Sequence, residues 1–66
     1  MRIIINAVNQ EVESGLSLLA LLGRIGKSPG QCVVERNGEI VDLEGFETVV
    51  LREHDRLEIV HFVGGG

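Results

Sequence analysis

The chain has 66 residues, room for one small domain, and carries six Lys and Arg against ten Asp and Glu, a formal net charge of −4. This acidic balance and the presence of only two aromatic residues argue against nucleic-acid binding. The single cysteine excludes an internal disulfide and a multi-cysteine metal site. The apolar runs are too short to span a membrane. Because so small an interior leaves little space for an active site, we expect a cytoplasmic carrier, adaptor or subunit that is not itself an enzyme.

The N-terminal segment predicts a β-hairpin. Its β-branched run, Ile3-Ile4-Ile5, indicates a buried strand over residues 2–6. We expect the chain to turn near Asn9 and to return as a half-buried strand over residues 11–13.

One helix follows the hairpin. Ser17 is a suitable N-cap, and Gly26 is placed to take the left-handed conformation after the last turn. The apolar residues between them recur at the spacing of one helix face, which predicts that this face packs on a core. They are Leu18, Leu21, Leu22 and Ile25.

The second half of the chain predicts short strands separated by polar turns. First come a strand over residues 32–34, a turn at Asn37-Gly38 and a strand over 40–41. A loop or single helical turn over 42–47 and a short strand over 49–51 follow. A charged turn over 52–55 then leads into a last strand over 56–63. Strands in mixed order around a single helix predict an α+β domain, with the helix packed across one face of a mixed sheet.

The last predicted strand has two different faces. Leu57, Ile59, His61 and Val63 alternate on the face expected to meet the helix. Val60 and Phe62 lie on the other face, where they form an exposed apolar spot suited to docking a partner, unless a neighbouring loop covers them.

Gly64, Gly65 and Gly66 follow this strand directly and divide the chain into a domain over residues 1–63 and a flexible tail over 64–66. Such a tail is either a frayed end or an arm thin enough to enter a narrow channel. The chemical group at its end is the carboxylate of Gly66, which needs activation, for example as an acyl-adenylate, before it reacts.

The chain resembles the ThiS family of sulfur carriers in thiamine biosynthesis. The resemblance covers almost the whole sequence and is carried by residues 3–6, 34–41 and 55–66, the last being its most specific part. It implies the β-grasp fold of ubiquitin, with one main helix on one face of a mixed sheet. The chain departs from the family pattern at one turn, where Glu53-His54-Asp55 stands in place of the frequent Asp-Gly-Asp. If the middle position of this turn requires a positive φ, we expect the backbone of His54 to be strained.

The resemblance also implies a mechanism in which the chain binds no cofactor itself. A ThiF-type enzyme, using ATP and Mg²⁺, adenylates the carboxylate of Gly66, and a cysteine-derived persulfide converts it to a thiocarboxylate. The tail, Gly64 to Gly66, then delivers sulfur to the thiazole synthase ThiG. Three alternatives stay open: a MoaD-type subunit of molybdopterin synthase, a ubiquitin-like protein modifier, and a regulatory module with an inert tail.

Other chemically active side chains have simpler interpretations. Cys32 precedes two valines and is predicted to be a buried, inert strand residue. His54 and His61 lack a third ligand at suitable spacing, so no metal site is expected. Four acidic residues are predicted to form a solvated face that helps docking to a basic partner: Glu11, Glu13, Glu53 and Asp55.

Overall fold

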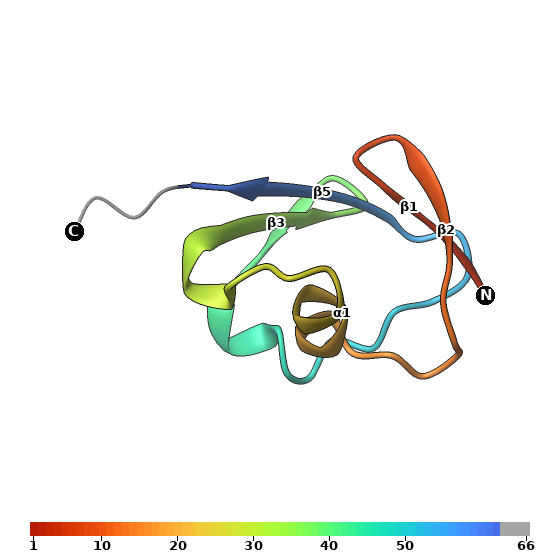
Figure 1. The fold of residues 1–66 in the computed structure, drawn as a ribbon, viewed down its shortest axis with the longest axis horizontal. Helices are drawn as coiled ribbons and strands as arrows, with labels where there is room; N and C mark the ends of the chain where they lie inside the picture. The colour runs from red at the N-terminus through yellow and green to blue at the C-terminus, as the bar shows by residue number, and fades with distance from the viewer. Residues whose placement is uncertain (63–66) are drawn as a thin grey trace.

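The computed structural model describes residues 1–62, which form a mixed sheet with one α-helix across one face (Figure 1). The five strands are β1 (Arg2–Ile5), β2 (Val8–Glu11), β3 (Cys32–Arg36), β4 (Glu39–Val41) and β5 (Arg56–His61). The helix is α1 (Leu18–Arg24), and two short 3₁₀ turns are η1 (Pro29–Gln31) and η2 (Leu43–Gly45). The predicted α+β arrangement is therefore confirmed.

The strand order β2-β1-β5-β3-β4 places the last strand of the sequence in the middle of the sheet. β5 runs parallel to β1 and antiparallel to β3, and each of these neighbours forms an antiparallel hairpin with the strand outside it. Figure 1 shows β5 extending past the end of β1 toward the C-terminus. The middle of the sheet thus leads directly to the end of the chain.

The first hairpin turns earlier than the sequence predicted. Asn6 and Ala7 occupy the two turn positions with φ of 48° and 69°, and Ile5 pairs with Val8. The predicted turn near Asn9 is wrong, because Asn9 pairs with a β1 residue inside β2. Two-residue hairpin turns favour positive φ at both positions, and alanine at the second position hides the usual Asn-Gly signal.

Both ends of α1 are capped as predicted. The Ser17 hydroxyl accepts a hydrogen bond from the Ala20 amide at 3.0 Å. At the other end Gly26 has a φ of 76°, and the Lys27 amide donates to the Leu22 carbonyl at 2.8 Å. These bonds satisfy backbone groups that a helix leaves unpaired at its termini.

The core lies between α1 and the inner face of the sheet. Its apolar residues are Ile3, Ile5, Leu16, Leu18, Leu21, Leu22, Cys32, Val34, Phe46, Leu51, Leu57 and Ile59. Burying each large side chain of this kind contributes about 1.5–3 kcal/mol. Ile25 was predicted to join them but is 40% exposed, because it is the C-cap residue and its backbone has already left the helical conformation.

The predicted turn at Asn37-Gly38 joins β3 to β4, with φ of 51° and 88°. The predicted strand over residues 49–51 is wrong, since Val50 forms only an isolated bridge with Ser17. The backbone partners of this segment are residues 16–18, which lead into α1, so the pairing ends after one bridge.

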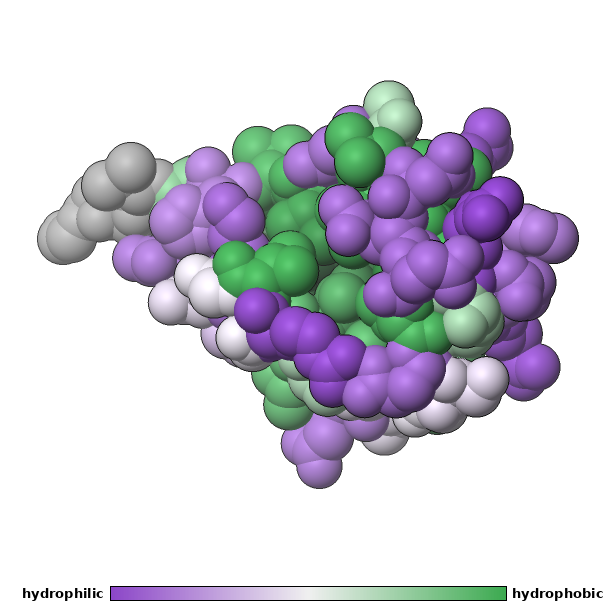
Figure 2. All heavy atoms as spheres, turned by 45° about the vertical axis from the view of Figure 1, so that its right-hand side comes forward, coloured by the Kyte–Doolittle hydropathy of each residue, from purple (hydrophilic) through white to green (hydrophobic). Residues whose placement is uncertain are grey.

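Hydrophilic side chains cover much of the surface seen in Figure 2, with apolar atoms visible between them. In the part of the chain that the structure describes, no helix has the length and apolar character needed to cross a membrane. The short, amphipathic α1 instead uses its leucine face for the core.

Candidate functional site

The candidate site is the exit of β5, the segment from Val60 to Phe62 that leads to the glycines. β3 supports this segment on one side, with Val60 opposite Val33 and His61 opposite Cys32. The Phe62 amide adds a hydrogen bond to the Gln31 carbonyl at 2.9 Å. The predicted tail residues, Gly64, Gly65 and Gly66, lie outside the described residues.

Asn6 fixes the other side of β5 just before the exit. Its backbone amide donates to the Leu57 carbonyl at 2.9 Å. Its side-chain amide donates to the Ile59 carbonyl at 3.1 Å, and its side-chain oxygen accepts from the Ile59 amide at 2.8 Å. Asn6 thus continues the β1–β5 pairing after β1 has ended. This role of Asn6 was not predicted from the sequence, because its partner Ile59 lies far away in the chain and is brought close only by the pairing of β1 with β5.

Val60 and Phe62 lie on the outer face of the sheet, away from α1. They are 60% and 44% exposed, so no loop within residues 1–62 covers them. Val33, opposite Val60 in register, is also 44% exposed and extends the apolar surface onto β3. Sequence reasoning missed Val33, because the pairing of β3 with β5 brings together residues far apart in the chain.

The inner face of β5 is buried only over its first half. Leu57 and Ile59 pack in the core, whereas His61 is exposed. Val63, which was predicted for the same face, lies outside the described residues. His61 lies on the inner face as predicted, since it is opposite the buried Cys32, but its side chain is exposed because it lies beyond the part of the sheet that the core covers. Its partner in register, Cys32, is buried and is the one cysteine of the chain.

Asp55, at the start of β5, is a buried structural residue and not part of a solvated acidic face as predicted. Its side chain is held by the Arg52 amide at 2.8 Å, the Asn37 side-chain amide at 2.9 Å and Arg36 Nε at 3.0 Å. Asn37 also accepts a hydrogen bond from the Arg56 amide at 2.9 Å. This cluster ties the β3–β4 turn to the segment that enters β5.

The same contacts change the acidity of Asp55. Burial disfavours the charged carboxylate and would raise its pKa. This effect is outweighed by hydrogen bonds from Asn37, the Arg52 amide and Arg36, and by the positive charge of Arg36. The pKa of Asp55 is therefore held below its ordinary value, so the carboxylate is ionised at neutral pH.

His54 has a φ of 69°, as expected if the turn before β5 requires a positive φ. Its amide donates to the Arg2 carbonyl at 2.7 Å, and the Glu53 carboxylate accepts from the Arg2 amide at 2.7 Å. The surrounding bonds thus hold a non-glycine residue in a conformation that glycine adopts more readily.

Two of the other acidic residues form ion pairs at the surface. Glu13 makes a bidentate pair with Arg24, and Glu11 lies 3.4 Å from the Nε of Arg2. Across residues 1–62, no group of three His, Cys, Asp or Glu side chains is placed to hold a metal ion.

Comparison with known proteins gives consistent matches over the whole chain. A sequence model of the ThiS family matches residues 3–66. The crystal structure of a thiamine biosynthesis protein (ThiS) from Geobacter metallireducens superposes with a TM-score of 0.84 at 28% identity and covers all of both chains. The predicted β-grasp fold is thereby confirmed.

Three curated proteins match in sequence. Thiazole synthases of Magnetococcus marinus and Paramagnetospirillum magneticum are 41% and 38% identical over all 66 residues of this chain, which spans only 20% of their length. The sulfur carrier protein ThiS of Bacillus subtilis is 56% identical over 34 residues, 52% of each chain.

Proposed function

The chain belongs to the ThiS family, and from this membership we propose that it is a sulfur carrier of thiamine biosynthesis that carries sulfur on Gly66. The printed name of the Bacillus subtilis relative, a sulfur carrier protein, supports the carrier role. The two thiazole synthases contain a segment similar to this entire chain, which supports a thiazole synthase of the ThiG type as the acceptor.

The proposed chemistry begins with activation of the Gly66 carboxylate by a ThiF-type enzyme that uses ATP and Mg²⁺. A carboxylate oxygen attacks the α-phosphorus, pyrophosphate leaves, and the resulting acyl-adenylate has a good leaving group. The terminal sulfur of a cysteine-derived persulfide then attacks the carbonyl carbon and AMP leaves. A thiol cleaves the remaining S–S bond, is itself oxidised to a disulfide, and releases the thiocarboxylate.

The observation that carries this proposal is the position of β5. Hydrogen bonds hold this strand from both sides up to Ile59, and the chain leaves the sheet at Phe62, four residues before Gly66. A rigid base of this kind suits an arm that enters another enzyme, because little ordering entropy is lost on docking. Gly64 and Gly65 supply a backbone that fits a narrow channel.

In this proposal the rest of the chain positions the arm and catalyses nothing. Val60 and Phe62 are the proposed docking residues, since their side chains are exposed beside the exit. Exposed apolar groups of this size gain free energy when a partner covers them.

The proposal is tested by intact-mass measurement. The protein purified from cells first shows whether Gly66 is the last residue. It is then incubated with ATP, Mg²⁺, the ThiF-type enzyme of the same organism and a persulfide donor. We expect a mass increase that corresponds to replacement of one oxygen by sulfur, and no increase for a variant without Gly66.

An unchanged mass contradicts the proposal if the same enzyme converts an authentic ThiS protein in a parallel reaction. Addition of the thiocarboxylate form to thiazole synthase and to molybdopterin synthase then separates the ThiS and MoaD interpretations. Attachment to lysines of other proteins indicates a protein modifier instead.

A further inference from the structure

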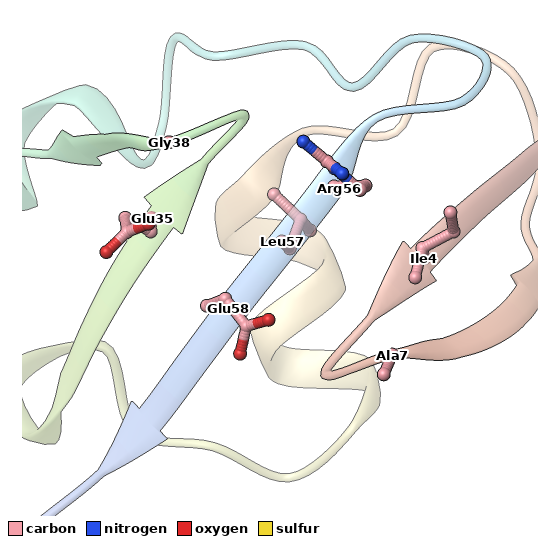
Figure 3. A pocket seen from close by; sticks show the side chains of 7 residues that line it. All are labelled: Ile4, Ala7, Glu35, Gly38, Arg56, Leu57 and Glu58. Carbon is pink, nitrogen blue, oxygen red and sulfur yellow. The ribbon is translucent and has the colours of Figure 1, made fainter.

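Two glutamates face each other on the outer side of the sheet. Glu35 on β3 is directly opposite Glu58 on β5 in the antiparallel register. Their neighbours Val34, Leu57 and Ile59 point into the core, so both glutamates point away from α1. Like charges directly opposite each other destabilise a sheet, and Figure 3 shows the two carboxylates pointing away from one another.

Neither glutamate takes part in an ion pair within residues 1–62. No Lys or Arg among these residues lies within ion-pair distance of either carboxylate. The nearby Arg36 is paired with Asp55. Arg56 lines the same hollow, but it forms no ion pair with Glu35 or Glu58.

The two glutamates line a hollow of about 340 Å³ on the outer face (Figure 3). Ile4 and Ala7 form its other side, so its walls combine apolar and charged groups. The hollow is open to solvent and lies between the turns of the two hairpins, where Ala7 and Gly38 line it.

The acidic pair continues into the apolar surface at the β5 exit. The next outward-facing pair along the same two strands is Val33 and Val60, and Phe62 follows. We call these five residues, Val33, Glu35, Glu58, Val60 and Phe62, the docking face. It is apolar toward the exit and acidic farther from it.

We propose that the docking face binds the adenylating enzyme, and that Glu35 and Glu58 together receive an arginine or lysine side chain of that enzyme. The inference rests on the proposed function, because adenylation is the first reaction of the carrier. An enzyme that holds ATP beside an incoming carboxylate needs positive charge around its site, which complements the net charge of −4 on this chain.

In the free protein Glu35 and Glu58 have no ion-pair partner within residues 1–62, whereas a cation that binds both of them forms charge-assisted hydrogen bonds. Arginine suits the position best, because its planar guanidinium has five donors that can reach two carboxylates at once.

The test compares two double variants with the same change in net charge. Glu35→Gln/Glu58→Gln alters the docking face, and Glu44→Gln/Glu47→Gln alters exposed residues of the η2 region. Calorimetry measures the Kd for the adenylating enzyme. We expect the first variant to bind about tenfold more weakly, with a weaker salt dependence, and the second to bind like the parent protein.

Thermal unfolding separates this interface from a structural role. We expect the Glu35→Gln/Glu58→Gln variant to be as stable as the parent or more stable. Equal losses of affinity in the two variants, or unchanged affinity in the first, overturn the proposal, as does a loss of stability that parallels the loss of binding. Because binding is measured without ATP, this result is independent of whether Gly66 is adenylated.

Discussion

The two ends of β5 differ in almost every physical respect. At its start, Asp55 is buried and receives hydrogen bonds from three residues on both neighbouring segments. At its exit, Val60 and Phe62 are exposed, and within residues 1–62 the backbone beyond Ile59 is paired on the β3 side alone. One strand thus joins a buried, hydrogen-bonded start to an exposed exit. Variants at its start are expected to affect folding, and variants at its exit to affect partners.

Removal of Gly66 is expected to have the largest effect on activity and the smallest effect on folding. We expect complete loss of adenylation, because the reacting carboxylate moves one residue back, and no change in the thermal unfolding midpoint. Pyrophosphate release and circular dichroism measure the two quantities. Adenylation of the shortened chain at the parent rate contradicts the assignment of Gly66.

Leu57→Ala and Phe62→Ala compare a buried and an exposed residue of the same segment. Leu57 is fully buried, so its truncation is expected to cost about 2–5 kcal/mol in the free energy of unfolding. Phe62→Ala is expected to cost less than about 1 kcal/mol and to weaken binding of the adenylating enzyme. Urea unfolding and calorimetry provide the measurements. Similar losses of stability in both variants place Phe62 in the core.

Asp55→Asn tests the cluster at the start of β5. The pKa of Asp55 is lowered in the folded state, so its stabilising effect is complete above its ordinary value of 3.8 and is lost as the pH falls through the lower folded value. We expect the variant to lose about 1–3 kcal/mol at neutral pH and to show a smaller further loss in acid.

Urea unfolding at several pH values measures this effect. High salt screens the exposed Glu13–Arg24 pair, so that its own titration contributes little. Parallel pH profiles for parent and variant would show that Asp55 does not contribute to acid unfolding.

His54→Gly is expected to have the smallest effect and the opposite sign. Glycine relieves the positive φ of 69°, but it also gains freedom in the unfolded chain, so the net stabilisation is expected to be below about 1 kcal/mol. Glu53→Gly is the matched control and is expected to destabilise, since its side chain accepts a hydrogen bond from the Arg2 amide. A loss of stability in His54→Gly contradicts the strain at this position.

Most features that depend on local sequence were predicted correctly; the first hairpin turn is an exception, because Ala7 hides the usual Asn-Gly signal. The cap at Ser17, the left-handed Gly26 and the turn at Asn37-Gly38 depend on residues within one turn of each other. The alternation in the last strand likewise predicted the outward positions of Val60 and Phe62, because side chains of a strand alternate between faces.

Features that depend on distant partners were missed. Asp55 follows charged residues in the sequence, and its burial requires Arg36 and Asn37 from another hairpin. The hydrogen bonds of Asn6 to Ile59 and the exposure of Val33 beside Val60 likewise follow from strand pairing. No window of neighbouring residues contains this information.

The position of β5 also determines how the domain assembles. The two hairpins form from nearby residues, yet they become one sheet only when the last strand enters between β1 and β3. Closing such a long loop slows folding more than it weakens the folded state. Until β5 has entered, the edges of β1 and β3 are unpaired and can pair with the β5 of a second molecule. We therefore expect the fraction of strand-exchanged dimer to rise with the protein concentration during refolding.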